Sequence, residues 1–313
     1  MTDRVPELSL TAFTNGDAAA RDAFSHDLMR GLQRFGFVIL KDHNVPEALL
    51  ERAYGLAETL FALPEEAKRR WAGGMRGYTP FGTEHAKDSR LPDLKEFWQI
   101  GHETVPATAD PEIFPPNIWP DENLEGLVGF RETFQDLFSG LNETGRLLLQ
   151  ALAPRLDLPR HWFDDKVEHG TSLLRVLHYP PVADDTPVGA VRSAAHEDIN
   201  FITILVAAKG AGLQLLDRDG TWLPVETDPR NLIVDSGDML QRLTNGVIPS
   251  TTHRVVNPEG PNVSRYSMPF FMHPTLETSL AALPSCLGDG PKWPATTAGA
   301  FLDERLRAIG LKR

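Results

Sequence analysis

The sequence predicts a mixed α+β protein whose mainly β core, an antiparallel barrel or a double-sheet jelly roll, is flanked by helices. Two patterns along the chain of 313 residues indicate this fold. Apolar residues recur at helical spacing as far as Ala153, whereas from Gly170 onward short apolar strands alternate with turn-forming residues. Several short strands at such spacing are typical of antiparallel barrels and jelly rolls. We therefore expect helices first, a sheet second and a short helical tail at 299–309.

The first half begins with an amphipathic helix. Phe24, Leu28 and Leu32 recur every four residues, and Gly36 is a typical helix end. The segment 73–120 is rich in Gly, Pro and charged residues, so we interpret it as mainly loop. The other elements expected in this half are a strand at 37–40, helices at 46–63 and 65–71, and a long helix at 121–153.

The second half is expected to contribute short strands rich in apolar and β-branched residues. They lie at 173–179, 200–207, 213–216, 232–234, 251–256 and 266–271. Turn-forming runs at 217–220 and 257–261 separate members of this series. An antiparallel arrangement would bring residues that are distant in sequence to one interior.

The charge balance limits the partners of the protein. The chain carries 31 Lys and Arg against 43 Asp and Glu, a net charge of −12 with His neutral. Binding to nucleic acid or to an anionic membrane surface would need a basic excess. The longest neutral, mostly apolar stretch, 199–208, is about half as long as a membrane span. We expect a small-molecule substrate, no nucleic acid and no membrane, and we favour a monomer while leaving the oligomeric state open.

Cysteine usage indicates the compartment. The single cysteine, Cys286, cannot form an internal disulfide, which favours a reducing environment. Charged residues interrupt the first thirty positions, so no segment of signal-peptide type is expected there. We therefore predict a cytoplasmic protein. No base accompanies Cys286 in the local sequence, which argues against a nucleophilic role.

The chemistry is indicated by His196-Glu197-Asp198, where alone among the ten histidines an Asp follows two positions later. On a strand, residues i and i+2 share a face, so His196 and Asp198 can reach one metal ion. His253 lies in the next candidate strand that carries a histidine. Two His and one carboxylate leave open coordination positions, which suits non-haem Fe(II), whereas structural zinc usually has four N or S ligands. No catalytic residue beyond these ligands is predicted.

A second group of residues is suited to an anion. Arg265 and Ser267 share a strand face by the same spacing, and a forked donor beside a hydroxyl matches a carboxylate. Tyr179 could add a phenol donor, and Arg175, on the same face, could add positive potential. We therefore predict a pocket for an anionic cosubstrate.

These residues stand in segments that together resemble the iron- and 2-oxoglutarate-dependent dioxygenase superfamily, in its isopenicillin N synthase-like branch. The segments that carry the resemblance are 178–181 (HYPP), 195–198 (AHED), 202–205 (ITIL), 212–215 (GLQL), 250–255 (STTHRV) and 265–267 (RYS), with 34–37 (RFGF), His43, 77–78 (GY) and 95–96 (KE) in the first half. Their order and spacing agree with that branch over most of the chain.

The resemblance implies a distorted double-stranded β-helix core with Fe(II) held by His196, Asp198 and His253. It implies that Arg265 and Ser267, with Tyr179 nearby, hold the distal carboxylate of 2-oxoglutarate. It further implies that O2 and 2-oxoglutarate are consumed, with release of succinate and CO2, while a small organic substrate is hydroxylated, desaturated or cyclised. The protein supplies geometry and the cofactor supplies the oxidant.

Two alternatives and a less favoured third stay open. An oxidase of the isopenicillin N synthase type would use the same Arg and Ser for a substrate carboxylate and would not need 2-oxoglutarate. A sensor would bind iron and 2-oxoglutarate without turnover. Zinc hydrolysis is less favoured because no general base accompanies the ligands.

The last predictions concern the residues that line the substrate pocket and the division of the chain into regions. Phe271 and Tyr78 are candidates to line the substrate side of the pocket. We divide the chain into a mostly helical N-terminal region at 1–165, a double-stranded β-helix domain at 166–280 and a helical tail at 281–313.

Overall fold

The computed structural model describes residues 4–84, 91–107 and 109–308. Its helices are α1 (Leu10–Thr14), α2 (Ala18–Phe35), α3 (Glu47–Ala62), α4 (Glu65–Arg69), α5 (Phe130–Leu152), α6 (Asp164–Val167), α7 (Asp238–Leu243) and α8 (Ala298–Ala308), with 3-10 turns at Ala153–Leu156 and Pro284–Cys286. Its strands are β1 (Glu7–Ser9), β2 (Phe37–Lys41), β3 (Gly77–Thr79), β4 (Glu96–Ile100), β5 (Leu173–Tyr179), β6 (Ser193–His196), β7 (Ile202–Lys209), β8 (Leu213–Leu216), β9 (Trp222–Pro224), β10 (Leu232–Ser236), β11 (His253–Val255) and β12 (Arg265–Met272).

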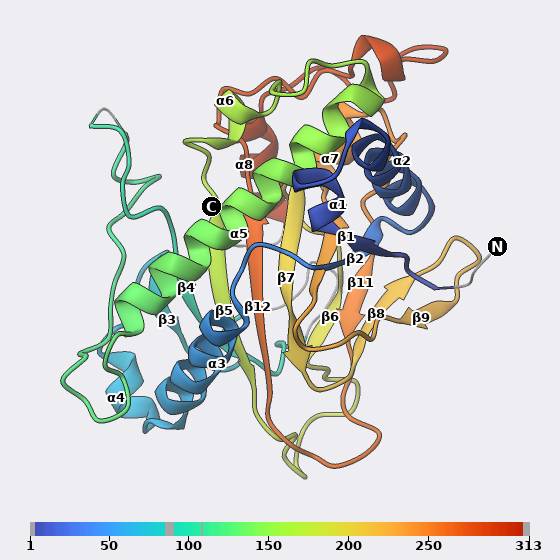
Figure 1. Ribbon diagram of the computed structural model, residues 1–313. Helices are drawn as coiled ribbons and strands as arrows, with labels where there is room; N and C mark the ends of the chain where they lie inside the picture. Colours follow the sequence, from blue (N-terminus) through green and yellow to red (C-terminus); the bar gives the residue numbers. More distant parts are fainter. Residues whose placement is uncertain (1–3, 85–90, 108, 309–313) are drawn as a thin grey trace.

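The strands form two sheets that face each other. The larger sheet has eight strands in the order β1-β2-β10-β7-β12-β5-β4-β3, and the smaller has four in the order β6-β11-β8-β9. Among these strands every neighbouring pair is antiparallel except β1 with β2. Figure 1 shows the long strands of the larger sheet side by side, with the smaller sheet beside them. This is the double-stranded β-helix arrangement, so the predicted fold class is confirmed.

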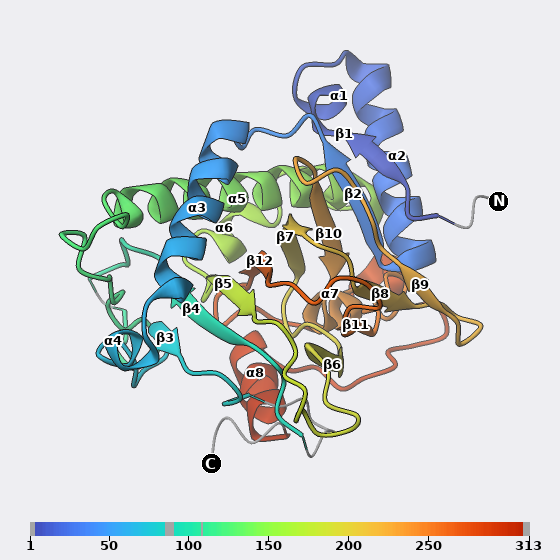
Figure 2. The ribbon, with the colours of Figure 1, turned by 90° about the horizontal axis from the view of Figure 1, so that it is seen from below.

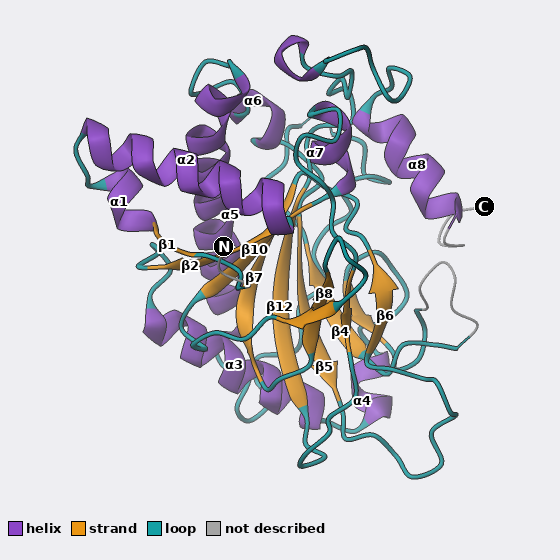
Figure 3. Ribbon diagram, turned by 90° about the vertical axis from the view of Figure 1, so that its right-hand side faces the viewer, coloured by secondary structure: helices purple, strands orange, loops and turns teal. Residues whose placement is uncertain are grey.

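Helices cover the outer face of the larger sheet. Figures 2 and 3 show α2, α3 and α5 together on that side, while α8 lies on the opposite side near β6. The buried side of α5 includes Phe134, Leu137, Phe138 and Leu141. The ring of Phe138 meets that of Phe270 on β12 edge to face at a centroid distance of 4.9 Å. Each such side chain, fully buried, stabilises the fold by roughly 1.5–3 kcal/mol, which anchors the helical layer.

A second apolar cluster fills part of the space between the sheets. It includes Phe37 of β2, Phe97 of β4, Leu177 of β5, Leu213 of β8 and Val255 of β11. Residues two positions along the same strands point to the same inner faces, because side chains alternate along a strand. They are therefore able to line a cavity between the sheets, next to this apolar cluster.

The segment interpreted as mainly loop at 73–120 also contains two short strands, which were not predicted. β3 and β4 extend the larger sheet, and Trp98 in β4 is fully buried. Every residue of β4 is buried, including Glu96 and Gln99, so the strand shows no polar and apolar alternation. The long helix begins at Phe130 instead of residue 121, because Gly129, with φ +76°, adopts a left-handed conformation just before it.

The other predicted helices and strands lie close to their predicted places, whereas the short helices α1, α6 and α7 were not predicted. The helical tail expected at 299–309 corresponds to α8 at Ala298–Ala308. The short strands β1, β6 and β9 were not predicted individually, because three or four residues are too few for a periodic signal. Within the described residues, no helix has both the length and the apolar character needed to cross a membrane.

Candidate active site

The candidate site is a cavity between the two sheets. The larger sheet contributes Tyr179, Thr203 and Arg265 to its lining, and the smaller sheet contributes His196 and His253. The lining also includes Asp198 and Ser267, so all the ligand candidates and the predicted anion donors share one cavity.

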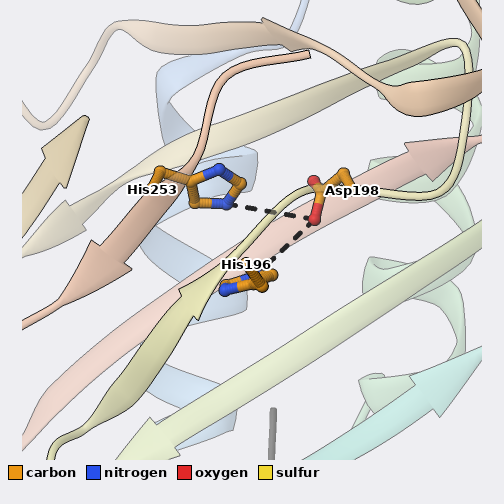
Figure 4. Close-up of side chains that lie close together, drawn as sticks. All are labelled: His196, Asp198 and His253. Carbon is orange, nitrogen blue, oxygen red and sulfur yellow. Dashed lines mark ion pairs between the residues drawn. The ribbon is translucent and has the colours of Figure 1, made fainter. Parts of the chain in front are cut away.

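Three side chains converge in this cavity with the geometry of a metal site. Asp198 Oδ1 is 3.7 Å from His196 Nε2 and 3.9 Å from His253 Nε2. One potential ligand atom from each of the three lies within 4.8 Å of the others. His196 ends β6 and is paired in register with His253 of β11, while Asp198 follows in the loop after β6 (Figure 4).

Backbone carbonyls fix the orientation of both imidazoles. His196 Nδ1 lies 2.8 Å from the carbonyl oxygen of Ala194, and His253 Nδ1 lies 3.1 Å from that of Thr251. A carbonyl can only accept, so each Nδ1 is the donor, which leaves Nε2 as the ring atom available to a metal ion. Phe37 supports His253 edge to face, with ring centroids 5.6 Å apart.

Burial favours the neutral form of the His196 imidazole. Burial lowers its pKa to about 4, and His253 adds to this shift while Asp198 opposes it. The His196 side chain is 36% exposed, and it lines the cavity. A neutral imidazole is the form that binds a cation.

The carboxylate of Asp198 is held on its other side. Thr203 Oγ1 donates to Asp198 Oδ2, and Asn200 Nδ2 donates to Thr203 Oγ1 at 2.8 Å. Oδ1 is therefore the oxygen that points toward the imidazoles. Two imidazoles and one carboxylate, oriented in this way, fit a divalent transition metal with open positions.

Arg265 offers unused donors to an anion. Its side chain is only 2% exposed, and its Nε and Nη1 atoms are buried without a hydrogen-bond partner among the described residues. Ser267 lies two positions along β12, and Tyr179 pairs with Arg265 across the ladder, with its ring centroid 5.1 Å from the guanidinium carbon. Buried polar groups are normally satisfied, so these donors fit a bound carboxylate such as that of 2-oxoglutarate.

Arg175 lines the cavity but is already paired. Its Nη atoms donate to the Glu84 carboxylate at 3.0 and 3.1 Å, and its Nε donates to Gln99 at 2.9 Å. The guanidinium carbon lies 4.5 Å from the centroid of Phe97 and 5.6 Å from that of Phe271. The structure thus places Arg175 toward the Phe271 end of β12 rather than beside Arg265.

The two residues expected to line the substrate side lie in different places. Phe271 lines the cavity, whereas Tyr78 is not among its lining residues. Tyr78 is buried, and its hydroxyl donates to Glu96, which also accepts from Lys68 at 2.7 Å and contacts His178 at 2.7 Å. Tyr78 therefore belongs to a hydrogen-bonded cluster outside the cavity.

Sequence reasoning gave no role in the site to several polar residues of the lining, among them Thr203, Lys95 and Asp235. Lys95 donates to Asp93 at 2.8 Å and lies 3.3 Å from Glu84. Burial lowers the pKa of Lys95, but these carboxylates outweigh burial, so the pKa is raised. Burial, together with the charge of Asp198, raises the pKa of Asp235 well above its usual value. Period-two spacing could have placed Asp235 on the inner face of β10, but nothing in the sequence indicated its proximity to Asp198.

Two family models match the chain. The 2OG-Fe(II) oxygenase superfamily model matches residues 170–274, and a model described as non-haem dioxygenase in morphine synthesis N-terminal matches residues 5–122. Among curated proteins, the chain is 33% identical to the proline hydroxylase buaE of Petromyces alliaceus, covering 90% of this chain and 91% of the relative. It is 30% identical to the 2-oxoglutarate-dependent dioxygenase gloF of Glarea lozoyensis, covering 92% and 94%.

Solved structures give the same picture. A putative 2OG-Fe(II) oxygenase family protein from Caulobacter crescentus superposes with a TM-score of 0.85 at 38% identity, covering 99% of this chain and all of that one (100%). A Neurospora crassa protein solved in complex with alpha-KG and thymine superposes with a TM-score of 0.87 at 28% identity, covering 97% and 96%. The resemblance inferred from the motifs is confirmed by these matches.

Proposed function

Because the chain belongs to the 2OG-Fe(II) oxygenase superfamily, and is thus an Fe(II)- and 2-oxoglutarate-dependent dioxygenase, we propose that His196, Asp198 and His253 hold its iron. The convergence of their ligand atoms within 4.8 Å is the observation that supports this assignment. Iron held there would supply the activation of O2 that is coupled to decarboxylation of 2-oxoglutarate. Both imidazoles are pre-oriented by carbonyls, so little reorganisation accompanies metal binding.

The distal carboxylate of 2-oxoglutarate is assigned to Arg265 and Ser267, with Tyr179 assisting. The free Nε and Nη1 donors of Arg265 support this role, because a buried guanidinium without a counter-anion is unfavourable. Arg175 is assigned to the wall of the cavity instead, since Glu84 already neutralises its charge.

The prime substrate is proposed to be a small organic molecule that enters beside Phe271 and Arg175. The cavity lining, which combines an aromatic ring with ion-paired Arg175 and Lys95, supports a substrate with both apolar and polar parts. The thymine in the Neurospora crassa complex is of this kind. Whether the reaction is hydroxylation, desaturation or cyclisation depends on that substrate.

The test is a screen for coupled turnover. Protein loaded with Fe(II) is mixed aerobically with 2-oxoglutarate and panels of small metabolites, and succinate is measured. We expect at least one compound to stimulate succinate formation. Oxygen uptake without 2-oxoglutarate would favour the oxidase alternative, and tight binding of 2-oxoglutarate without consumption across the panel would favour the sensor.

Three broader assignments remain proposals. The division at 1–165, 166–280 and 281–313 is supported by the order of helices, strands and tail, although β1 to β4 are hydrogen-bonded into the larger sheet. A cytoplasmic location is supported by the single, unpaired Cys286. A monomer is supported by the candidate site, because one chain supplies both the metal-ligand candidates and the anion donors.

A further inference from the structure

The C-terminal helix α8 reaches the loop that carries the metal-ligand candidates. Arg305 Nη2 lies 2.8 Å from Asp238 Oδ2 and 3.9 Å from Glu197 Oε2. Glu197 stands between His196 and Asp198 in sequence, and its side chain points away from the cavity. One guanidinium therefore contacts two carboxylates behind the ligand loop.

Asp238 and Glu197 each make a hydrogen bond to a segment that carries a ligand candidate. The backbone N–H of Asp238 donates to the carbonyl oxygen of Asp198 at 2.8 Å. Glu197 Oε1 accepts a hydrogen bond from Thr252 Oγ1, and Thr252 immediately precedes His253. Arg305 is thus linked through Asp238 to Asp198, and through Glu197 to both histidine-bearing strands.

The helix that carries Arg305 is itself firmly placed. Phe301 is 7% exposed and packs in the main apolar core. At the start of α8, the backbone N–H groups of Ala298 and Gly299 donate to the carbonyls of Thr278 and Leu276 at 2.8 and 2.9 Å. A side chain on such a helix can hold a loop in place, because the helix does not have to be ordered when the contact forms.

The contact with Asp238 is also shielded from solvent. The Asp238 side chain is 9% exposed and that of Arg305 is 26% exposed. Three carboxylates, those of Glu197, Asp198 and Asp238, lie in this small region, and Arg305 supplies positive charge behind them. Removing it would leave Asp238 and Glu197 to repel each other beside the ligand loop.

We propose that Arg305 is a positioning residue for the metal site, holding the 196–198 loop and the start of β11 in the metal-binding geometry from a helix near the C-terminus. This inference rests on the assignment of His196, Asp198 and His253 as metal ligands. Partners one step behind metal ligands typically change metal affinity by about 10- to 100-fold when they are lost.

The experiment compares Co(II) binding by the purified full chain and its variants, by titration followed through the visible absorption of bound Co(II). We expect Arg305→Gln to weaken Co(II) binding about 10-fold and Arg305→Lys to recover part of that loss. Arg307→Gln is the matched control, because Arg307 is on the same helix, is 58% exposed and lies 4.0 Å from Asp303. Its Co(II) affinity should equal that of the native chain.

Glu197→Gln provides a second route. The amide can still accept from Thr252, but it removes the charge that faces Arg305, and the Arg305–Asp238 pair remains to hold α8. We expect it to weaken Co(II) binding in the same direction, and we expect the double variant Arg305→Gln/Glu197→Gln to lose less than the product of the single losses. If Arg305→Gln does not fold, the single variant Glu197→Gln tests the proposal by itself.

Two results would overturn the inference at different levels. If Arg305→Gln and Glu197→Gln bind Co(II) like the native chain while His253→Ala does not, Arg305 has no positioning role and the metal site stands. If His253→Ala binds Co(II) as well as the native chain, the metal assignment fails and the inference fails with it.

Discussion

Each imidazole of the candidate metal site is oriented by a carbonyl oxygen two residues earlier in its own chain segment, Ala194 for His196 and Thr251 for His253. Backbone partners of this kind depend on strand geometry and not on a distant side chain. Asp198 differs, because its second oxygen depends on Thr203 in β7. Substitutions at single positions should therefore have unequal effects on the site.

Loss of the Arg265 guanidinium should mainly affect the cosubstrate. We expect Arg265→Gln to raise the 2-oxoglutarate concentration needed for half-maximal succinate formation by roughly 10- to 100-fold, because charge-assisted hydrogen bonds contribute about 1.5–3 kcal/mol. Arg254→Gln is the control, since Arg254 is on β11 but its guanidinium stacks on Trp222, 3.9 Å from the ring centroid. An unchanged requirement in Arg265→Gln would place the anion site elsewhere.

Thr203→Val should weaken metal binding, and it should also lower the free energy of unfolding by about 1–3 kcal/mol because the buried Asn200 amide loses its acceptor. The substitution keeps the shape of the side chain but removes the hydroxyl that donates to Asp198 Oδ2. We expect Co(II) affinity to fall about 10-fold. Thr203→Ser, which retains a hydroxyl, should bind Co(II) nearly as the native chain does. Equal affinities in the Val and Ser variants would contradict this role for the hydroxyl.

At the scale of elements, the turn between α2 and β2 is closely packed against the segment that precedes β11. Gly36 has φ +68°, and a Cβ added there would lie 2.1 Å from Thr251 Oγ1. Gly36→Ala should lower the free energy of unfolding by about 3 kcal/mol, combining left-handed strain of about 1–2 kcal/mol with overpacking. Urea unfolding measures this change.

Gly55 provides the matched control for that substitution. It lies within α3, and a Cβ added there would meet nothing within 4 Å. Gly55→Ala should stabilise the protein by about 0.5–1 kcal/mol, because Ala is the better helix former. If both variants were equally stable, the close approach of Gly36 to Thr251 would not matter for folding.

The Glu96 cluster joins α4 to the edge of the larger sheet. Lys68 of α4, with a side chain 6% exposed, donates to Glu96, as does Tyr78 of β3. Glu96→Gln would leave the Lys68 ammonium buried without a counter-charge. We expect a loss of about 3–5 kcal/mol in the free energy of unfolding. Lys68→Met/Glu96→Gln, which removes both charges, should recover part of it.

The same cluster predicts a dependence of stability on pH. Burial raises the pKa of Glu96, but hydrogen bonds from His178, Lys68 and Tyr78 outweigh burial, so the pKa lies below its usual 4.5. A carboxyl group with a depressed pKa stabilises the fold above its unfolded pKa, and this contribution is lost as the pH falls through the folded value. The native chain should therefore lose stability below about pH 4.5 more steeply than Glu96→Gln does. Parallel curves in urea unfolding at several pH values would contradict this.

For the whole molecule, ligands bound in the cavity between the two sheets should stabilise it against heat. Under anaerobic conditions, Fe(II) and 2-oxoglutarate, each at about 100 times its Kd, should each add about 2.7 kcal/mol to the free energy of unfolding. Differential scanning fluorimetry would report this as a rise in Tm. His253→Ala should lose the rise due to Fe(II), and a full rise in that variant would contradict its role as a ligand.

The order of helices and strands, and the three metal-ligand candidates, could be predicted because they depend on local period and on known motif chemistry. The ion pair of Arg175 with Glu84 could not be predicted, because the two residues are 91 positions apart and only folding brings them together. β4 was missed because it is buried on both faces and its polar residues are satisfied by partners from other elements. Arg305 gave no signal because its partners are defined only when α8 packs near β6.

The separation of the two groups of site residues has a consequence for selectivity. The metal-ligand candidates belong to the smaller sheet and the loop after β6, while Arg265, Ser267 and Tyr179 belong to the larger sheet. The distance between the two groups is set by how the sheets pack. It therefore limits the length of a diacid that could bind the metal ion and Arg265 at the same time. If the proposed anion site is correct, homologous diacids one methylene shorter or longer should fit this distance poorly.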